Sequence, residues 1–302
     1  MAPDGATAPF VSRFWDRDKS NPLARDQTRF GAFGTMAAFT DKVVIITGAS
    51  DGIGAELARQ LATQRPRLVL AARRLAELEA IAEECRRIGA ECLTLRTDVA
   101  EQAECVALIE ATIARFGRID VLVANAGVSG HARLDAVTDL AWYERMMRIN
   151  LFGTLWCCHA ALPHLKASRG LIVGVSSLAG KIGVPGRTAY CASKFAMAGL
   201  LEALRAELVD DGVGVTIVYP GVVATRIRYH GFGADGAPAG KSGLDEHGMM
   251  PVETCARQMI DAMTARRREL VMTAKGRLGL WLKLIAPGVV DRMARAALNK
   301  GA

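Results

Sequence analysis

The sequence predicts an α/β fold in which a doubly wound, seven-stranded parallel sheet is covered by helices on both faces. Seven short runs rich in Val, Ile and Leu indicate strands at residues 42–47, 67–72, 92–96, 121–125, 170–176, 214–219 and 269–273. Longer segments with helical periodicity alternate with them, at residues 54–64, 74–88, 101–116, 138–166, 188–210 and 252–265. Apolar strands that alternate with helices are typical of a parallel sheet buried on both faces. Ligands of such sheets bind beyond the carboxyl ends of the strands, so function is expected there.

The composition narrows the class of protein. The chain has 302 residues, of which 51% are hydrophobic, and this suits one large α/β domain. Its net charge of +7 is concentrated in residues 266–302, which hold nine Lys or Arg against two Asp or Glu. Because the rest of the chain is balanced in charge, a nucleic-acid-binding surface is not expected. The seven cysteines form no CxxC pair and the five histidines are scattered, which favours a reducing cytoplasm and no metal site.

The chain is expected to have three parts. Residues 1–40 mix Pro, Gly and both charges, which predicts a flexible extension, and Met36 is an alternative start. Residues 41–275 carry the alternating strand and helix pattern of a single domain. Residues 276–302 predict two basic amphipathic helices divided at Pro287. No apolar run reaches the roughly 18 residues that indicate a membrane-spanning helix.

The turn after the first strand has the composition of a nucleotide-binding loop. It reads TGASDGIG and leads directly into a helix. Glycines at such a turn let the backbone approach a pyrophosphate, which then lies at the N-terminus of the helix. The spacing G-x-x-x-G-x-G differs from G-x-G-x-x-G, and an ordinary glycine-rich turn is the alternative. The residues expected to contact the nucleotide here are Gly48, Ser50, Asp51, Gly52, Ile53 and Gly54.

Two further strand ends carry residues that suit a nucleotide. Asp98 and Val99 follow the third strand, and the Asp98 carboxylate could accept a hydrogen bond from an adenine amino group or cap the next helix. Asn125, Ala126 and Gly127 form a small turn after the fourth strand. Together with the first turn, these residues predict one nucleotide site at three strand ends.

Residues 176–194 read SSLAGKIGVPGRTAYCASK and place Tyr190 four residues before Lys194. The two side chains share one face if this segment is helical. A cation near a phenol stabilises the phenolate, so Lys194 is expected to lower the pKa of Tyr190 from about 10 toward the working pH of an acid–base catalyst. Ser177 follows a buried strand, where its hydroxyl could bind a substrate oxygen. The alternative is a core tyrosine, a solvated lysine and an ordinary strand-end serine.

These motifs resemble those of the short-chain dehydrogenase/reductase family. TGASDGIG, NAG, the serine and YCASK occur in the family's order, and the likeness covers about residues 40–275. The resemblance implies a Rossmann-type sheet, a nicotinamide cofactor and hydride transfer to or from an alcohol carbon. The run SSLAGKIGVPGRTAYCASKFA is similar to the branch that contains hydroxysteroid dehydrogenases and related membrane-associated reductases.

The resemblance also implies roles for individual residues. The lysine that Lys194 matches binds the nicotinamide ribose, so Tyr190 and Lys194 are expected to contact the cofactor as well as to act in catalysis. Asn150, in RINLFGTL, matches an asparagine that extends the proton relay through water. The loop after the sixth strand is expected to contact the nicotinamide carboxamide, and a simple Pro-Gly turn is its alternative. The residues of this loop are Pro220, Gly221, Val223 and Thr225.

The end of the second strand bears on the choice between NADP and NAD. An acidic residue at Ala72 would bind the ribose 2′-hydroxyl of NAD, but Arg73 and Arg74 follow instead. Guanidinium groups form bidentate bonds with phosphate, which favours NADP. Asp51 favours NAD, and the two arginines could simply begin a helix. The sequence therefore predicts NADP, with NAD as the less favoured cofactor.

The sequence thus predicts an NADP-dependent oxidoreductase that interconverts a hydrophobic secondary alcohol and its ketone. A reductase of 3-oxoacyl thioesters on a carrier protein and a non-catalytic NADP-binding sensor or scaffold are the alternatives. Residues 226–250 contain six glycines and are expected to cover the substrate as a lid. The resemblance implies a homodimer or homotetramer built on the helices 138–166 and 188–210. The basic tail could pack on the body, form a subunit contact or lie on an anionic membrane.

Overall fold

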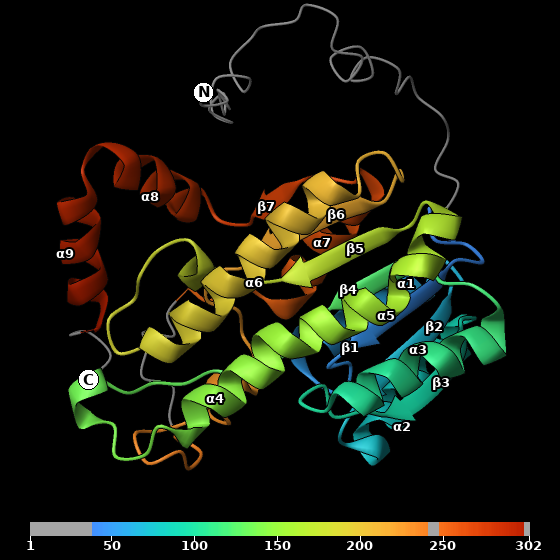
Figure 1. The fold of residues 1–302 in the computed structure, drawn as a ribbon, viewed down its shortest axis with the longest axis horizontal. Helices are drawn as coiled ribbons and strands as arrows, with labels where there is room; N and C mark the ends of the chain where they lie inside the picture. The colour runs from blue at the N-terminus through green and yellow to red at the C-terminus, as the bar shows by residue number, and fades with distance from the viewer. Residues whose placement is uncertain (1–37, 241–247, 299–302) are drawn as a thin grey trace, which may run out of the picture. The chain divides into compact units, whose positions relative to one another are not determined.

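The computed structural model describes residues 38–240 and 248–298, and its strands form the predicted seven-stranded parallel sheet. The strand order is β3-β2-β1-β4-β5-β6-β7, with every neighbouring pair parallel (Figure 1). The strands are β1 (Val43–Thr47), β2 (Arg67–Ala72), β3 (Glu91–Arg96), β4 (Val121–Ala124), β5 (Leu171–Val175), β6 (Gly214–Tyr219) and β7 (Glu269–Val271). The chain moves outward from β1 to β3 and then returns to the other side of β1 at β4. This reversal opens a crevice at the carboxyl ends of β1 and β4.

Helices cover both faces of the sheet because each carries one apolar stripe. One face is covered by α1 (Gly52–Ala62), α2 (Leu75–Ile88) and α7 (Val252–Thr264). The other is covered by α3 (Gln102–Phe116), α5 (Gly153–Ser168) and α6 (Thr188–Glu207). Fully buried side chains such as Leu57 on α1 and Leu201 on α6 fill the two layers. Burying one such leucine contributes about 1.5–3 kcal/mol, which keeps the strand ends in fixed positions.

The predicted helix over 138–166 is wrong as a single element. The structure has α4 (Ala141–Met147), a π-helical turn (Arg148–Phe152) and then α5. A π turn holds one residue more than an α turn, so it changes the direction in which the following side chains point. Asn150 lies in this turn and is fully buried, which ties the irregularity to the predicted site.

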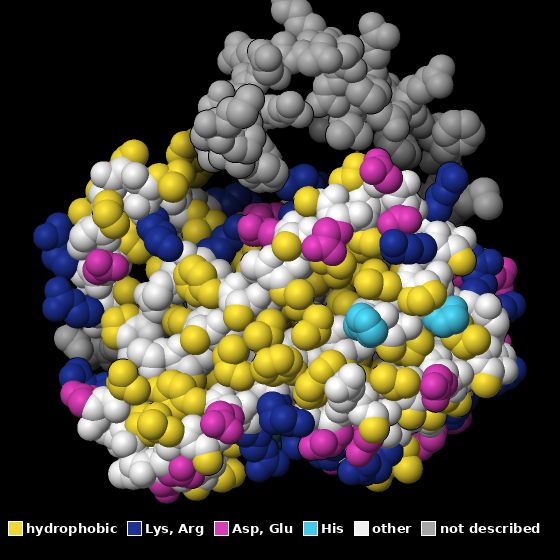
Figure 2. Space-filling view, viewed as in Figure 1, with side chains coloured by type: hydrophobic (Ala, Val, Ile, Leu, Met, Phe, Trp, Pro, Cys, Tyr) yellow, Lys and Arg dark blue, Asp and Glu magenta, His cyan; other side chains and the backbone are white. Residues whose placement is uncertain are grey.

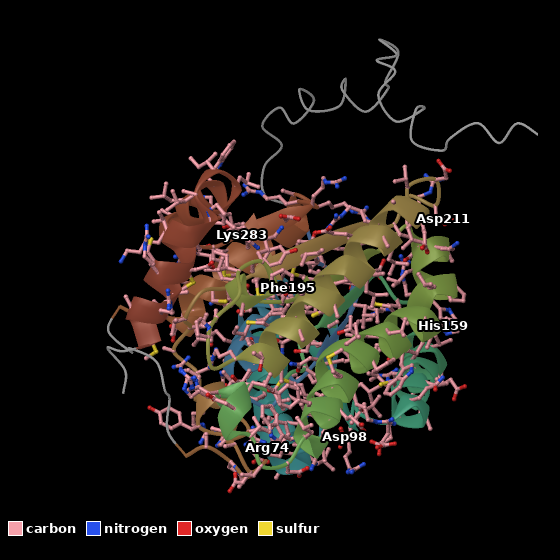
Figure 3. All side chains as sticks on the ribbon, turned by 60° about the vertical axis from the view of Figure 1, so that its left-hand side comes forward. Arg74, Asp98, His159, Phe195, Asp211 and Lys283 are labelled. Atoms are coloured by element: carbon pink, nitrogen blue, oxygen red, sulfur yellow. The ribbon has the colours of Figure 1, made fainter. Side chains whose placement is uncertain are left out.

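Two helices form the tail, α8 (Ala274–Ile285) and α9 (Pro287–Leu298), and they divide at Pro287 as predicted. Proline is tolerated at the first position of a helix because the N–H that it lacks would have no partner there. One side of α8 remains open to solvent, with large apolar residues Leu278, Trp281, Leu284 and Ile285 between 69% and 81% exposed. Lys283 reaches from α8 to α6, where its ammonium lies 5.4 Å from the ring centroid of Phe195 (Figure 3).

Some predictions fall outside the described residues. The expected N-terminal extension, with Met36, is one of them, and so are positions 241–247 of the expected lid. All seven cysteines lie in the described ranges and are free thiols. Within those ranges no helix is long and apolar enough to cross a membrane, and no group of His, Cys, Asp or Glu side chains could hold a metal ion.

Candidate active site

The glycine-rich turn forms a cradle at the end of β1. Gly48 has φ of +67° and Gly52 has φ of +55°, in the left-handed region that glycine adopts without strain. A Cβ at Gly48 would lie 2.8 Å from Cα of Ala126, so the turns after β1 and β4 touch each other. A Cβ at Gly54 would lie 2.5 Å from Nδ2 of Asn125, which explains this third glycine by close packing of helix and strand. The backbone therefore suits a pyrophosphate at the N-terminus of α1.

Asp51 is the N-cap of α1, and it is surrounded by cations. Its Oδ1 accepts a hydrogen bond from the Gly52 amide at 2.7 Å, and its Oδ2 lies 3.1 Å from Arg226 and 3.6 Å from Arg74. Partial burial opposes ionisation, but the Gly52 hydrogen bond and the two arginines outweigh it and lower the pKa of Asp51. The Asp51 charge is thereby largely neutralised, which weakens the argument that it favours NAD.

The two arginines after β2 differ in their contacts. Arg74 makes ion pairs with Asp51 and with Glu77, the latter at 3.3 Å. Arg73 is exposed, lines the same cavity and makes no ion pair with any described residue. Arg73 is therefore the more available of the two for a phosphate.

The ends of β3 and β4 carry the other predicted nucleotide contacts. Asp98 uses Oδ1 to accept from the Ala100 amide at 3.0 Å, which closes a local turn ahead of α3; the N-cap of α3 is Glu101, so Asp98 does not cap that helix. Arg74 and Asp98 both lie toward the lower edge of the molecule in Figure 3. The Asn125 side chain donates to the carbonyl of Thr47 at 2.9 Å, which locks the turn after β4 to the end of β1. Asn125 thus shapes the cradle through the backbone.

Ser177, Tyr190 and Lys194 meet at the carboxyl end of β5. Ser177 caps a short 3₁₀ turn (Leu178–Gly180) by accepting from the Ala179 amide, and its hydroxyl is close enough to Tyr190 to act on the pKa of the phenol. Tyr190 and Lys194 lie four residues apart on α6, and the Lys194 ammonium is 6.0 Å from the Tyr190 ring centroid. Lys194 Nζ donates to the carbonyl of Val175 at 2.9 Å. The predicted helical relation between the tyrosine and the lysine is therefore present.

The electrostatics of Tyr190 differ from the expectation. Burial raises the pKa of Tyr190, while Arg187, the Ser177 hydrogen bond and Arg228 act in the opposite direction. Lys194 is itself buried, with 3% exposure, and burial lowers its own pKa to about 8. Tyr190 is consequently a protonated phenol at neutral pH.

Both polar atoms of the Asn150 side-chain amide form hydrogen bonds with other residues of the protein. Oδ1 accepts from the Val128 amide at 2.8 Å, and Nδ2 donates to Ser193 Oγ at 2.9 Å and to the Val128 carbonyl at 3.0 Å. A Cβ placed at Gly127 would lie 3.1 Å from Asn150 Oδ1 and 3.3 Å from Lys194 Nζ. Asn150 therefore borders the lysine, although it does not line the cavity.

One cavity of about 1260 Å³ joins the cradle to the tyrosine. Every predicted cofactor residue lines it except Gly54, and so do Ser177, Tyr190 and Lys194. Apolar walls that the sequence did not predict come from the segment after β5, with Leu178 and Ile182, and from α9, with Val290, Met293 and Ala294. This side of α9 therefore faces the cavity, which agrees with the alternative in which the tail packs on the body.

The described part of the expected lid packs on the substrate side. Phe232 pairs with Gly130, and its ring lies 5.7 Å from Trp142 on α4. Met249 and Met250 line the cavity. Arg187 and Arg228 also line it, with exposures of 9% and 7%, and sequence reasoning missed both. The residues next to these two arginines give no sign in the sequence that either will be buried.

A glycine-rich first turn and a serine–tyrosine–lysine group in one cavity define a class of dinucleotide-binding oxidoreductases. The short chain dehydrogenase family matches residues 42–231, and the chain belongs to this family. The predicted resemblance is confirmed, and with it an oxidoreductase that acts on CH–OH groups.

Individual relatives agree with this assignment. The chain is 35% identical over 264 residues to a protein of Sesamum indicum named 11-beta-hydroxysteroid dehydrogenase A, covering 84% of this chain and 74% of the relative. An alcohol dehydrogenase from Thermococcus sibiricus, solved with 5-hydroxy-NADP, superposes with a TM-score of 0.66 at 28% identity, covering 76% of this chain and 93% of that one. A metagenomic short-chain oxidoreductase in complex with NADP gives a TM-score of 0.59 at 34% identity, covering 62% and 86%.

Proposed function

We propose that the protein is an NADP-dependent oxidoreductase that interconverts a hydrophobic secondary alcohol and its ketone. The observation that carries this proposal is the grouping of Ser177, Tyr190 and the buried Lys194 in the same cavity as the glycine-rich cradle. A hydroxyl pair that can hold one oxygen, next to a dinucleotide cradle, suits proton transfer coupled to oxidation or reduction of that carbon.

The residues fit a nicotinamide dinucleotide. The left-handed glycines and the N-terminus of α1 would receive its pyrophosphate, and Asp98 and Val99 would border its adenine. Lys194 would bind the nicotinamide ribose, and the loop containing Val223 would contact the carboxamide. The cofactor, when bound, supplies the hydride donor or acceptor.

Tyr190 then serves as the general acid and base. Its phenol is protonated at neutral pH, so it can donate a proton from Oη to the oxygen of a ketone. Ser177 orients that oxygen. For the reverse transfer, Lys194 stabilises the ionised phenol and Asn150 extends the relay of the proton. General acid–base catalysis of this kind contributes about 10²–10⁴-fold to the rate.

Arg73 supports the preference for NADP over NAD. It lies at the end of β2, where the ribose 2′-position of a bound cofactor would be, and it has no ion pair with a described residue. Its guanidinium could bind a 2′-phosphate through two parallel hydrogen bonds. NADP in the two solved relatives is consistent with this choice.

A homodimer or homotetramer is proposed through α5 and α6. Hydrophobic side chains gather over the middle of the face in Figure 2, where these helices run in Figure 1. On this side Phe152 is 40% exposed and stacks on Trp156 at 5.6 Å. Apolar surface that a single chain leaves open is typical of a contact between copies.

The open side of α8 is proposed as a peripheral contact with an anionic membrane. Its exposed apolar residues, such as Trp281 and Leu284, stand beside the cations Lys275, Arg277 and Lys283. This combination suits a helix that lies in the headgroup region of a bilayer. A contact between subunits through the same residues is the outcome that would replace it.

Titration of the purified chain with NADPH and, separately, with NADH tests the cofactor, followed by turnover of hydrophobic ketones. We expect tight NADPH binding, and loss of turnover in Tyr190→Phe with NADPH binding retained. The 3-oxoacyl thioesters serve as the competing substrate class. Equal turnover of every ketone by Tyr190→Phe would show that the catalytic assignment is wrong.

A further inference from the structure

Among the described residues, basic side chains outnumber acidic ones on the substrate side of the cavity. Among the described residues that line the cavity, the only acids are Asp51 and Asp98, and both lie at the nucleotide end of the sheet. Beyond Tyr190, the lining contains Arg187, Arg228, His230 and Lys275, with no described carboxylate among them.

Arg187 is the most informative of these cations. It precedes α6 by one residue and is only 9% exposed. Its Nη2 donates to Ser129 Oγ at 3.1 Å, whereas Nε is buried and has no hydrogen-bond partner. No described acid makes an ion pair with it. Because a buried guanidinium is costly without an anion, and Arg187 lines the cavity, an anionic ligand there would reduce this cost.

The position of Arg187 indicates where the ligand group would lie. Its guanidinium carbon is 5.3 Å from the ring centroid of Tyr190, closer than the Lys194 ammonium at 6.0 Å. Arg228 lines the same cavity as Arg187 and Tyr190. Arg228 is fixed by donation from Nη1 to the Val223 carbonyl at 3.0 Å.

We propose that Arg187, supported by Arg228, binds an anionic group of the substrate close to the reacting carbon, so that the natural substrate is an apolar alcohol or ketone bearing a carboxylate. The apolar walls formed by residues such as Ile182 and Met293 receive the rest of the molecule. The guanidinium fork matches a carboxylate, and the enclosed site protects the pair from screening by salt. This inference rests on the proposed function for the identity of the reacting carbon.

Binding without turnover tests the site itself. Calorimetry compares decanoate with decanol on the full chain carrying Tyr190→Phe, saturated with NADPH, so that a tyrosine phenolate cannot be the partner of Arg187. We expect decanoate to bind about tenfold to a hundredfold more tightly, as one charge-assisted hydrogen-bonded pair provides. Arg187→Met in the same background should remove this preference. Arg277→Met, a change to an exposed arginine of α8 that does not line the cavity, should keep it.

One further variant and a folding control keep the result interpretable. Arg187→Lys retains the charge but loses the fork, and we expect a preference of a few-fold. Thermal unfolding and NADPH binding show that each variant is folded. If Arg187→Met does not fold, the reduced preference of Arg187→Lys decides the question. Unchanged decanoate binding in the folded Arg187 variants would overturn the inference.

Turnover then separates this inference from the proposed reaction. The wild-type chain with NADPH is given 4-oxodecanoate and its methyl ester, and kcat/KM should be at least about tenfold higher for the acid. Equal values for acid and ester, with no decanoate preference, would refute the anion site while leaving the reaction intact. A decanoate preference that depends on Arg187, with no ketone reduced, would support the site and refute the reaction.

Discussion

Burial of Lys194 makes a quantitative prediction about stability and pH. The side chain is 3% exposed, and burial lowers its pKa from 10.5 to about 8. Between these values the unfolded chain binds a proton that the folded chain does not bind. Stability contributed at this residue therefore rises with pH from about 8 to 10.5, and it is constant below that window because both states are charged.

The size of this change in stability follows from the shift in the pKa of Lys194. At roughly 1.4 kcal/mol per pKa unit, the wild type should gain about 2 kcal/mol at Lys194 between pH 7.5 and pH 10. Lys194→Met has no group that titrates here. The difference in unfolding free energy between the variant and the wild type should therefore change by about 2 kcal/mol, in favour of the wild type, as the pH rises.

Urea unfolding of the chain without cofactor, at pH 7.5 and pH 10, measures this difference. Buried thiols such as Cys158, with a pKa raised to about 12, lower stability at high pH in both proteins, so their effect cancels in the comparison. Lys194→Gln is the matched control, because it keeps a donor for the Val175 carbonyl and should change with pH as the methionine variant does. A free-energy difference that stays constant within a few tenths of a kcal/mol would refute a buried, shifted lysine.

Other predictions address the cofactor and the surfaces. Arg73→Ala should weaken NADPH binding by about tenfold and leave NADH binding nearly unchanged. Arg74→Ala should weaken NADPH binding less, because Arg74 already pairs with Asp51 and Glu77. Equal losses of affinity for both cofactors would contradict the phosphate contact. Phe152→Glu should shift the sedimentation coefficient toward that of a monomer, and an unchanged coefficient would place the subunit contact elsewhere. The wild type should co-sediment with anionic vesicles at low salt, and Trp281→Ser should co-sediment less. If the wild type does not co-sediment, or if Trp281→Ser has an altered oligomeric state, a subunit contact through α8 is favoured instead.

The fold could be predicted because its signals are local. Each strand is an apolar run and each helix has its own period, so the order of elements follows from the chain alone. That the proposed nucleotide residues line one cavity could be predicted for a related reason, since the carboxyl ends of parallel strands meet at one edge. The break in 138–166 could not, because a π turn depends on how the Asn150 amide is satisfied by Val128 and Ser193. Those partners come from distant segments.

The role of α9 was missed for a similar reason. Its apolar stripe predicts a buried face but does not say what covers it, and the structure directs Val290, Met293 and Ala294 to the cavity. The direction of the Tyr190 pKa shift in this structure was not predicted, because spacing gives the distance between two groups and not their burial. Burial changed the sign of the result, since it raises the pKa of the phenol and lowers that of the ammonium.

The buried cations also predict that ligands should raise the free energy of unfolding. Lys194 and Arg187 are both held in the cavity wall without an acidic partner among the described residues, and each burial opposes folding. A bound cofactor offers oxygen acceptors to Lys194, and a carboxylate offers them to Arg187. Each ligand therefore removes part of a cost that the empty fold carries. Binding of NADPH and of decanoate should raise the unfolding free energy together, and the decanoate part should vanish in Arg187→Met.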